Sequence, residues 1–476
     1  MINFEYLPNR RICRLTGDKF DEIREHFSVK NPNAFFMKRF GRRFTNDRIY
    51  CITPTGLFDT GMFYEILRYI AGCFPEIEIK YDDKIKQAIK PSLGNNALPY
   101  DSLNLKLRDY QQETVKQALL FGRGIIKVGT GGGKTLTIAS LISTYFSLNS
   151  KVKILLIVPD LTLVDQTFKD FNNYGVPFKC TRWTGSIDPD LTSDVVIANI
   201  GVLQSRFDQH PWLINVDMVI VDECHKLKKG NKVCKLIADI KTNHKFGLTG
   251  TLPDNKVDEW NIIGKLGTVF YEKTSYDLRV ENYLTNAEIK IVEITYKDKV
   301  QYSQTANKFK TELDFIYASK FRNKLISALC KMSNNNTLVL VNHISHGLEM
   351  FNSLTELLPN KKVYFIRGEV DVDERARVIQ EMEKNDNVVC IAISAIFSTG
   401  VNVKNLHNIV FASGGKSFIR IIQSIGRGLR LNDNKQKLII YDIADKLKYS
   451  LAHSEKRKEI YKLEKIVFTE NNIVEK

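Results

Sequence analysis

The chain has 476 residues, of which 43% are hydrophobic and 26% charged, the balance of a water-soluble globular protein with an ample core. Its formal net charge of +15 favours an anionic partner, and nucleic acid is the first candidate. The eight cysteines are scattered, so we do not expect a disulfide scaffold. No signal-peptide core opens the sequence, and no run approaches the ~20 apolar residues of a membrane span. We therefore expect a cytoplasmic protein that is not membrane-bound.

The first expected unit is a small α/β module over residues 1–95. Its centre is basic, because six lysines and arginines lie between Lys30 and Arg48 against the single acid Asp47. The stretch KRFGRRF alternates basic and aromatic residues, which suits phosphates and stacked bases, so we predict a DNA-binding module, with a charged solvent-facing segment as the alternative. The turn-rich residues 90–102 are expected to let the module sit apart from the rest. The predicted DNA contacts are Lys38, Arg39, Arg42 and Arg43.

Two regions of alternating strands and helices follow. Apolar runs such as GIIKV, KILLIV, DVVIANI and MVIVD alternate with helical segments, and the alternation returns with TLVLV, KVYFI, NVVCIAI and NIVF. This pattern predicts parallel sheets that are covered by helices on both faces. The expected fold class is therefore α/β, with two tandem parallel-sheet domains after the small N-terminal α/β domain. Their expected bounds are 103–252 and 334–447, with a connector at 253–333 and a C-terminal amphipathic helix at 448–476.

A glycine-rich loop, KVGTGGGKT, lies between an apolar strand and a helical segment, the context of a phosphate-binding loop. Its glycines let backbone N–H groups face a polyphosphate, and the following helix presents its positive end. Val128 departs from the strict pattern, which has glycine there, and a simple glycine-rich turn is the alternative. We expect Lys134 to reach the terminal phosphates and Thr135 to ligate Mg²⁺. The predicted nucleotide-binding residues of the loop are Thr130, Gly131, Gly132, Gly133, Lys134 and Thr135.

The stretch IVDECHKL, at residues 220–227, places two carboxylates at the end of an apolar strand. Downstream of a phosphate loop, Asp222 is expected to hold Mg²⁺ and Glu223 to polarise the attacking water, the two tasks that hydrolysis of a phosphoanhydride needs. A zinc site would need more Cys or His ligands at suitable spacing. A Cys/His catalytic pair is disfavoured because neighbouring side chains at a strand end diverge.

Together with other blocks in the same order, these motifs resemble the superfamily-two helicases, whose motor consists of two RecA-like domains. LRDYQQ resembles the adenine-reading block, and IVPDLTLVDQ resembles a strand-contacting block in which Asp160 replaces the usual Thr. GLTGT, STGVNVKNL and QSIGRGLR resemble three later blocks, the last with Ser424 in place of the usual early Arg. The resemblance implies nucleotide contacts at Arg108, Gln111 and Gly400, coupling residues Thr249, Thr251 and Gln423, DNA contacts at Pro159 and Thr399, and arginine fingers Arg427 and Arg430.

Within that superfamily, the blocks NHISHGLEMF, RGEVDVDERARVI and IIQSIGRGLR resemble the phage UvsW-type helicases. The resemblance implies ATP and Mg²⁺ as cofactors, branched or forked duplex DNA as the substrate, fork regression and branch migration as the activity, and movement from 3′ to 5′. A monomer suffices because both motor domains lie in one chain, and no obligate protein partner is indicated. An unwinder of RNA or RNA–DNA hybrids, a nucleotide-switched DNA-binding protein that does not unwind, and the motor subunit of a restriction complex are the alternatives.

Overall fold

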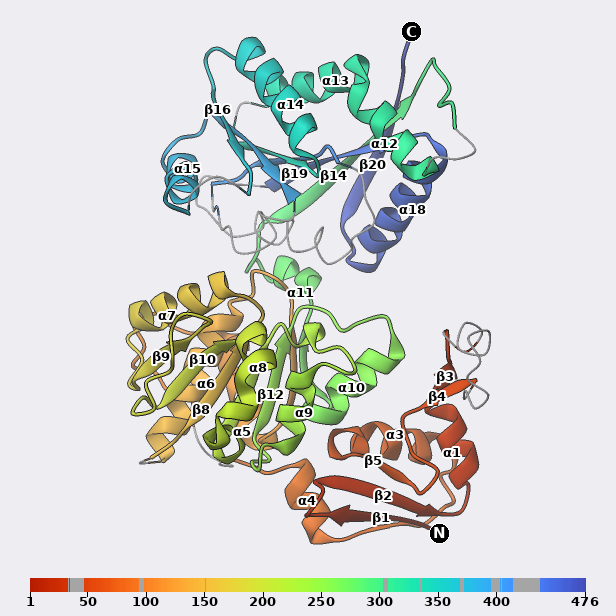
Figure 1. Ribbon diagram of the computed structural model, residues 1–476, viewed down its shortest axis with the longest axis vertical. Helices are drawn as coiled ribbons and strands as arrows, with labels where there is room; N and C mark the ends of the chain where they lie inside the picture. Colours follow the sequence, from red (N-terminus) through yellow and green to blue (C-terminus); the bar gives the residue numbers. More distant parts are fainter. Residues whose placement is uncertain are drawn as a thin grey trace. The chain divides into compact units, whose positions relative to one another are not determined.

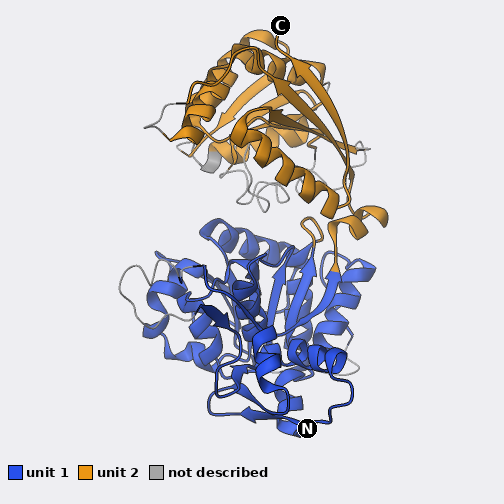
Figure 2. Cartoon of the chain, turned by 90° about the vertical axis from the view of Figure 1, so that its right-hand side faces the viewer, with its two compact units in different colours: residues 1–128, 133–272 blue, residues 129–132, 273–476 orange. Residues whose placement is uncertain are grey.

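The computed structural model divides the chain into two compact units (Figure 2). The first unit contains Met1–Val128 and Gly133–Glu272, and the second contains Gly129–Gly132 and Lys273–Lys476. Within the part of the chain that the structure describes, no helix is both long and apolar enough to cross a membrane. The described residues are 1–32, 34, 47–93, 98–149, 151–302, 307–333, 335–368, 372–394, 403, 405–413 and 437–476.

The N-terminal module is built on a four-stranded mixed sheet of order β5-β2-β1-β6 (Figure 1). β1 pairs antiparallel with β2 and parallel with β6. Alternate residues of β1 and β2 are buried, as expected for strands with one face on a core. That core is closed by the apolar sides of α1 and α3. The elements are β1 (Ile2–Leu7), β2 (Ile12–Gly17), α1 (Phe20–His26), β5 (Leu57–Asp59), η1 (Thr60–Met62), α3 (Phe63–Cys73), β6 (Ile79–Tyr81) and α4 (Asp83–Ile89).

A separate two-stranded ribbon in this module pairs β3 (Ser28–Lys30) antiparallel with β4 (Arg48–Tyr50). The predicted DNA-contacting segment lies between these strands in the sequence. Its four basic residues, Lys38, Arg39, Arg42 and Arg43, lie outside the described residues, so their role stays a prediction.

The N-terminal module does not sit apart, contrary to the expectation from the turn-rich residues 90–102. It shares a hydrophobic cluster with the sheet that follows. The buried guanidinium of Arg123 donates to the backbone carbonyls of Ala88 and Leu266, at 2.9 and 3.2 Å. Lys265 forms an ion pair with Asp59 at 2.7 Å. The shared apolar cluster and the buried Arg123 hold the module against the sheet. The turn-rich composition of residues 90–102 carries no information about these tertiary contacts.

The first motor sheet has the order β13-β7-β12-β11-β8-β10-β9, and β7, β12, β11, β8, β10 and β9 pair in parallel (Figure 1). Every residue of β8 and of β10 is buried, as both-face coverage by helices requires. The strands are β7 (Gly124–Val128), β8 (Ile154–Val158), β9 (Cys180–Trp183), β10 (Val195–Asn199), β11 (Met218–Asp222), β12 (Lys245–Thr249) and β13 (Val269–Lys273). The helices are α5 (Asp109–Phe121), α6 (Lys134–Leu148), α7 (Leu161–Tyr174), α8 (Ile200–Arg206), α9 (Lys232–Asp239) and α10 (Lys256–Leu266), with short turns η2 (Phe207–Gln209), η3 (Pro211–Asn215) and η4 (Cys224–Lys226).

The second motor sheet has the order β16-β17-β15-β18-β19-β14-β20, with parallel pairing throughout. The predicted fold class, two tandem parallel-sheet domains after a small α/β module, is therefore confirmed. The strands are β14 (Asn286–Thr295), β15 (Thr337–Val341), β16 (Lys362–Ile366), β17 (Val388–Ile393), β18 (Asn408–Phe411), β19 (Lys437–Asp445) and β20 (Val467–Val474). The helices are α11 (Ser275–Val280), α12 (Lys308–Ala318), α13 (Lys320–Met332), α14 (Ile344–Leu357), α15 (Val372–Lys384) and α18 (Lys448–Leu463).

Two expected segments differ from the observed elements. Residues 448–476 do not form one helix, because α18 ends at Leu463 and β20 then pairs in parallel with β14. The expected connector at 253–333 is not a separate body either. It contributes α10 and β13 to the first unit, and β14, α12 and α13 to the second. In both cases backbone pairing with a strand far away in the sequence decides the structure, which local composition does not report.

Candidate functional site

The glycine-rich loop joins β7 to α6, as the sequence predicts for a phosphate loop. Gly131 has a φ of 84°, and Gly133, which precedes the first turn of α6, has a φ of 73°. Glycine adopts this left-handed backbone without the cost that a Cβ imposes, and the turn it allows brings the chain directly into the N-terminus of α6. Lys134 and Thr135 are the first residues of that helix, where positive potential is greatest.

The side-chain amide of Gln111, the residue expected to read the adenine base, joins the start of α5 to the loop. Its Oε1 accepts a hydrogen bond from the backbone N–H of Arg108 at 2.9 Å, and its Nε2 donates to the carbonyl of Gly133 at 3.3 Å. A Cβ at Gly133 would lie 2.5 Å from the same Nε2. The Gln111 side chain is 2% exposed. Gln111 therefore buttresses the loop, and a base contact through Gln111 or Arg108 stays a prediction.

A line of polar contacts connects the loop to the two strand ends beyond it. Lys134 Nζ lies 3.3 Å from Glu223 Oε1, and His225 Nδ1 lies 3.2 Å from Glu223 Oε2. The same His225 nitrogen lies 2.9 Å from Thr249 Oγ1, and that hydroxyl donates to the carbonyl of Thr251 at 2.7 Å. The structure thus brings together the predicted phosphate-contacting lysine, the predicted water-orienting carboxylate and both predicted coupling threonines. The sequence analysis assigns no role to His225. Its position two residues after Glu223 is the feature of the sequence that could have indicated this contact.

The two carboxylates at the end of β11 have opposite electrostatic environments. Burial raises the pKa of Asp222, and the negative charge of Glu223 raises it further. Burial alone would also raise the pKa of Glu223, but the Lys134 ammonium and the His225 imidazole together lower it below its usual range. Glu223 is held as the anion beside Lys134, while Asp222 is a partly buried carboxylate whose charge is less well compensated. Such a carboxylate is stabilised by a cation, which fits the predicted Mg²⁺ ligand.

Glu223 is also unusual in its backbone. Its φ of 50° lies in the left-handed region, which is uncommon for a residue with a Cβ. The backbone N–H of Glu223 donates to Asp222 Oδ1 at 3.0 Å. This turn separates the directions of consecutive side chains, so that Glu223 contacts Lys134 while Cys224 enters the core. Strain of this kind is typical of functional positions in proteins.

Cys224 has the surroundings of a core residue. Its side chain is fully buried, and its Sγ would lie 2.9 Å from a Cβ added at Gly247 of β12. Burial raises the pKa of its thiol well above the ordinary value, and the charges of Glu223 and Asp222 raise it further. The thiolate is the reactive form of cysteine, so these surroundings do not support thiol chemistry. Within the described residues, no group of three or more His, Cys, Asp or Glu side chains could hold a metal ion.

Other predicted positions of the first motor lie at its strand ends. Pro159 follows β8, and Asp160 caps α7 by accepting a hydrogen bond from the backbone N–H of Leu163 at 3.1 Å. The substitution of the family's usual Thr is thereby explained, because Asp and Thr both serve as N-caps. The predicted residues of the second motor lie outside the described residues: Thr399, Gly400, Gln423, Arg427 and Arg430. Their roles remain predictions.

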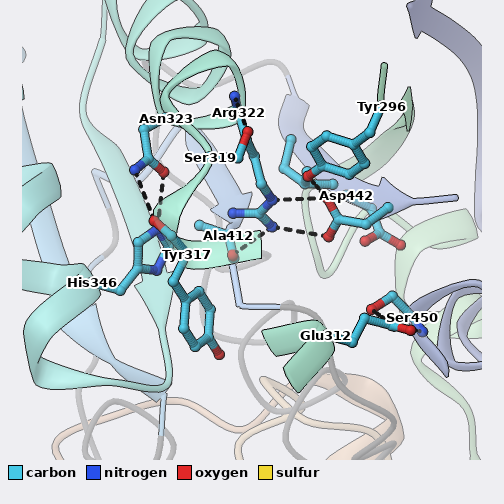
Figure 3. A network of polar contacts seen from close by, with 12 residues as sticks. Tyr296, Glu312, Tyr317, Ser319, Arg322, Asn323, His346, Ala412, Asp442 and Ser450 are labelled. Atoms are coloured by element: carbon cyan, nitrogen blue, oxygen red, sulfur yellow. Dashed lines mark hydrogen bonds and ion pairs between the residues drawn. The ribbon is translucent and has the colours of Figure 1, made fainter. Parts of the chain in front are cut away.

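The second motor carries a buried polar network at the carboxyl ends of its strands (Figure 3). Arg322 of α13 is fully buried and forms an ion pair with Asp445, at the end of β19, at 2.9 Å. It also donates to the carbonyl of Ala412, directly after β18, at 2.8 Å. Tyr296 donates to the same Asp445 at 2.6 Å. One guanidinium therefore fixes the ends of two neighbouring strands, and sequence reasoning did not single it out.

The buried His346 of the NHISH stretch belongs to the same region. Its Nε2 lies 3.2 Å from Asn323 Oδ1, and its ring stacks on Tyr317 with centroids 4.7 Å apart. Burial lowers the pKa of His346 to about 3, with the charge of Arg322 adding to the effect. These contacts describe a neutral, packed histidine.

The comparisons with known proteins cover both motor domains. Residues 104–254 match the family described as the res subunit of type III restriction enzymes, and residues 320–432 match the helicase conserved C-terminal domain. The chain is 29% identical to the ATP-dependent DNA helicase UvsW of Enterobacteria phage T4, over 90% of this chain and 87% of that protein. It is 25% identical to the DNA 3′-5′ translocase XPB2 of Sulfurisphaera tokodaii, over 77% of this chain and 90% of that protein.

Among solved structures, a fragment of an HsdR subunit of a type I restriction enzyme from Vibrio vulnificus YJ016 aligns with a TM-score of 0.58 and 16% identity. The alignment covers 86% of this chain and 74% of that one, and at this identity it supports the fold alone. The two parallel sheets, the loop between β7 and α6 and the two matched families define an ATP-dependent helicase of superfamily two. Within that class, the chain is similar to the UvsW helicase of phage T4 along 90% of its length.

Proposed function

We propose that ATP is hydrolysed at the loop between β7 and α6. The observation that carries this proposal is the line of contacts from Lys134 through Glu223 and His225 to Thr249. In this arrangement Lys134 is positioned for the terminal phosphates, and Glu223 is kept as the anion that orients the attacking water. Because His225 joins Glu223 to Thr249, a change at the reacting phosphate would also alter the loop that holds Thr251.

Mg²⁺ fits the same site. Thr135 and Asp222 are the proposed ligands, and the raised pKa of Asp222 marks a partly buried carboxylate that a cation would stabilise. Bound there, the ion would neutralise charge on the phosphate oxygens. Thr130 and the glycines 131–133 would offer backbone N–H groups to the phosphates, and Lys134 would supply the side-chain positive charge.

The second motor completes the proposed cycle. Arg427 and Arg430 would stabilise charge on the terminal phosphate, and Gly400 would contact the nucleotide. Gln423 would transmit the change, together with Thr249 and Thr251. Arginine fingers that arrive with a second domain make hydrolysis depend on domain closure, the property that a translocating motor needs.

We propose that the substrate is branched or forked duplex DNA, which is unwound and remodelled by movement from 3′ to 5′. Support comes from the relative described as a DNA helicase and from the relative described as a 3′-5′ DNA translocase. The basic segment between β3 and β4 supports an additional DNA contact through Lys38, Arg39, Arg42 and Arg43, beside Pro159 and Thr399 in the motors. One chain would suffice for this activity.

The decisive experiment is strand displacement on forks, Holliday junctions, linear duplexes and RNA–DNA hybrids of equal length, with and without ATP. We expect ATP-dependent displacement that is fastest on forks and junctions. Faster displacement of the hybrids would support the RNA–DNA alternative. ATP turnover without displacement of any substrate would support a nucleotide-switched binding protein.

A further inference from the structure

The first glycine of the phosphate loop lies against the chain that leads into the second motor. The backbone N–H of Gly129 donates to the carbonyl of Lys273 at 3.0 Å. A Cβ at Gly129 would lie 2.7 Å from the backbone nitrogen of Ser275 and 2.9 Å from its Cα, and closer still to its hydroxyl. Ser275 is itself buried. The compact unit that contains the second motor accordingly includes Gly129–Gly132 (Figure 2).

This contact gives a reason for the glycine at position 129. Val128, where the pattern has glycine, is a buried residue at the end of β7. Position 129 is the one that tolerates no side chain, because Gly129 faces backbone atoms of Ser275. Backbone atoms cannot rotate away as the end of a long side chain can, so the contact is stiff.

The short segment after Lys273, which contains α11, is held by hydrogen bonds at both of its ends. Thr274 caps α11 through a reciprocal pair, in which its Oγ1 accepts from the N–H of Asp277 at 3.1 Å while Asp277 Oδ2 accepts from the N–H of Thr274 at 2.9 Å. At the other end of α11, the buried Arg279 donates to the carbonyl of Glu464 at 2.6 Å. Lys465 Nζ lies 4.5 Å from the ring centroid of Tyr276.

Glu464 directly follows α18, which is fixed to the second motor sheet. Arg457 of α18 forms a buried ion pair with Asp442 of β19 at 2.8 Å, and Tyr461 donates to the same carboxylate at 2.9 Å. Contacts among described residues therefore run without a break from the phosphate loop through Ser275 and Arg279 to α18 and β19.

We propose that Ser275 and Arg279 are positioning residues that tie the phosphate loop to the second motor, so that a movement of the loop on nucleotide exchange displaces α11 and α18. The proposal rests on the proposed ATP site. Neither residue touches the nucleotide in this scheme. Ser275 acts through its backbone contact with Gly129, and Arg279 acts through its bond to the Glu464 carbonyl. Disturbing either contact should separate hydrolysis from DNA movement.

The first test is a double-mutant cycle of Gly129→Ala and Ser275→Ala. Gly129→Ala forces a side chain against Ser275, and we expect strand displacement per ATP to fall roughly fivefold or more, the scale of coupling between sites in proteins. Ser275→Ala removes the atom closest to the added Cβ, so the double variant should recover part of the loss. Gly72→Ala is the matched control, because a Cβ there meets nothing within 4 Å. Strictly additive effects in the cycle would overturn the contact as the cause.

The second test uses a residue remote from the loop. Arg279→Gln removes the bond to the Glu464 carbonyl, and we expect ATP turnover at saturating DNA to stay within about twofold while displacement per ATP falls roughly fivefold. Arg24→Gln is the control, since Arg24 also donates to a backbone carbonyl, that of Ile52. Lys465→Ala is a milder change to the same junction and covers the case that Arg279→Gln does not fold.

An unchanged displacement per ATP in folded Arg279→Gln and Lys465→Ala would overturn the proposal. Lys134→Ala separates this failure from failure of the ATP site. Normal hydrolysis in Lys134→Ala would refute the site itself. If Lys134→Ala loses hydrolysis while Arg279→Gln keeps normal displacement per ATP, the ATP site stands. Only the proposed coupling through Ser275 and Arg279 is then refuted.

Discussion

At the scale of single residues, the site depends on side chains that follow one another in sequence but point in different directions. Asp222 and Glu223 could be predicted because two carboxylates at a strand end after a glycine-rich loop form a local pattern. The contacts of Gln111 with Gly133 and of Gly129 with Ser275 could not be predicted, because they join segments that are far apart in the chain. The local sequence pattern identifies the candidate residues, but their contacts depend on the tertiary structure.

Glu223→Gln should separate binding from hydrolysis. The amide keeps the shape of the side chain but loses the charge that Lys134 and His225 stabilise. Hydrolysis should fall by roughly 10²–10⁴, the range for loss of a general base, while Mg-ATP binding is retained. Nucleotide affinity by a fluorescent analogue and steady-state turnover provide the measurement. Turnover close to wild type would mean that another group orients the water.

His346 should make stability depend on pH. Its pKa is lowered to about 3 in the folded protein against about 6.5 when unfolded, so between these values the unfolded chain binds a proton that the folded chain does not. Stability therefore falls as the pH drops below about 6.5, by up to roughly 1.4 kcal/mol per pH unit for this group.

His346→Gln should flatten that dependence. Urea unfolding between pH 4 and 7 would measure it, with the exposed His343→Gln as the control of the same residue type. A slope in His346→Gln equal to that of the wild type would show that other groups cause the acid sensitivity.

At the scale of elements, the central strands were predictable and several others were not. β8, β10, β11 and β15 are short apolar runs buried along nearly their whole length, and such runs stand out in a sequence. β9, β13 and β20 lie at the edges of their sheets and are only partly buried, so their sequences lack that signal. β14 is longer and mixes polar with apolar residues. Edge position, which is a property of the whole sheet, therefore limits what local composition reveals.

Removal of residues 467–476 should leave β14 as the edge of the second sheet. β20 is mostly exposed, but β14 contains the fully buried Ile289 and Ile291. A long edge strand with unpaired backbone N–H and C=O groups favours pairing with other chains. We expect the shortened protein to aggregate during heating at a lower temperature than the full chain, as light scattering would record. Unchanged aggregation and melting would mean that β14 needs no partner on that side.

At the scale of the whole molecule, we expect that removing positive charges from the N-terminal module will weaken DNA binding without changing ATP hydrolysis. Replacing Arg39, Arg42 and Arg43 with Ala should weaken fork binding most at low salt, because each phosphate contact contributes about 0.9 to the slope of log affinity against log salt. The slope should fall by up to about 3 if all three touch phosphate. Maximal ATPase rates at saturating DNA should change little.

Fork affinity across a salt series, beside those ATPase rates, is the measurement for this triple variant. Arg14→Ala is a suitable control from the same module, since its side chain is already paired with Glu5 on the surface. Equal slopes for the wild type and the triple variant would place junction choice within the motor domains.

The common hydrophobic cluster of the N-terminal module and the first motor has a consequence for protein engineering. A chimera cut within residues 90–102 would divide that cluster and leave the buried Arg123 without its bond to Ala88. A transplant that exchanges the module between helicases would therefore have to carry the facing surface of α10 and Arg123 with it. The same constraint applies to natural recombination. Because the two parts share a core, we expect the module and the first motor to be inherited together, and functional descendants in which recombination has separated them to be rare.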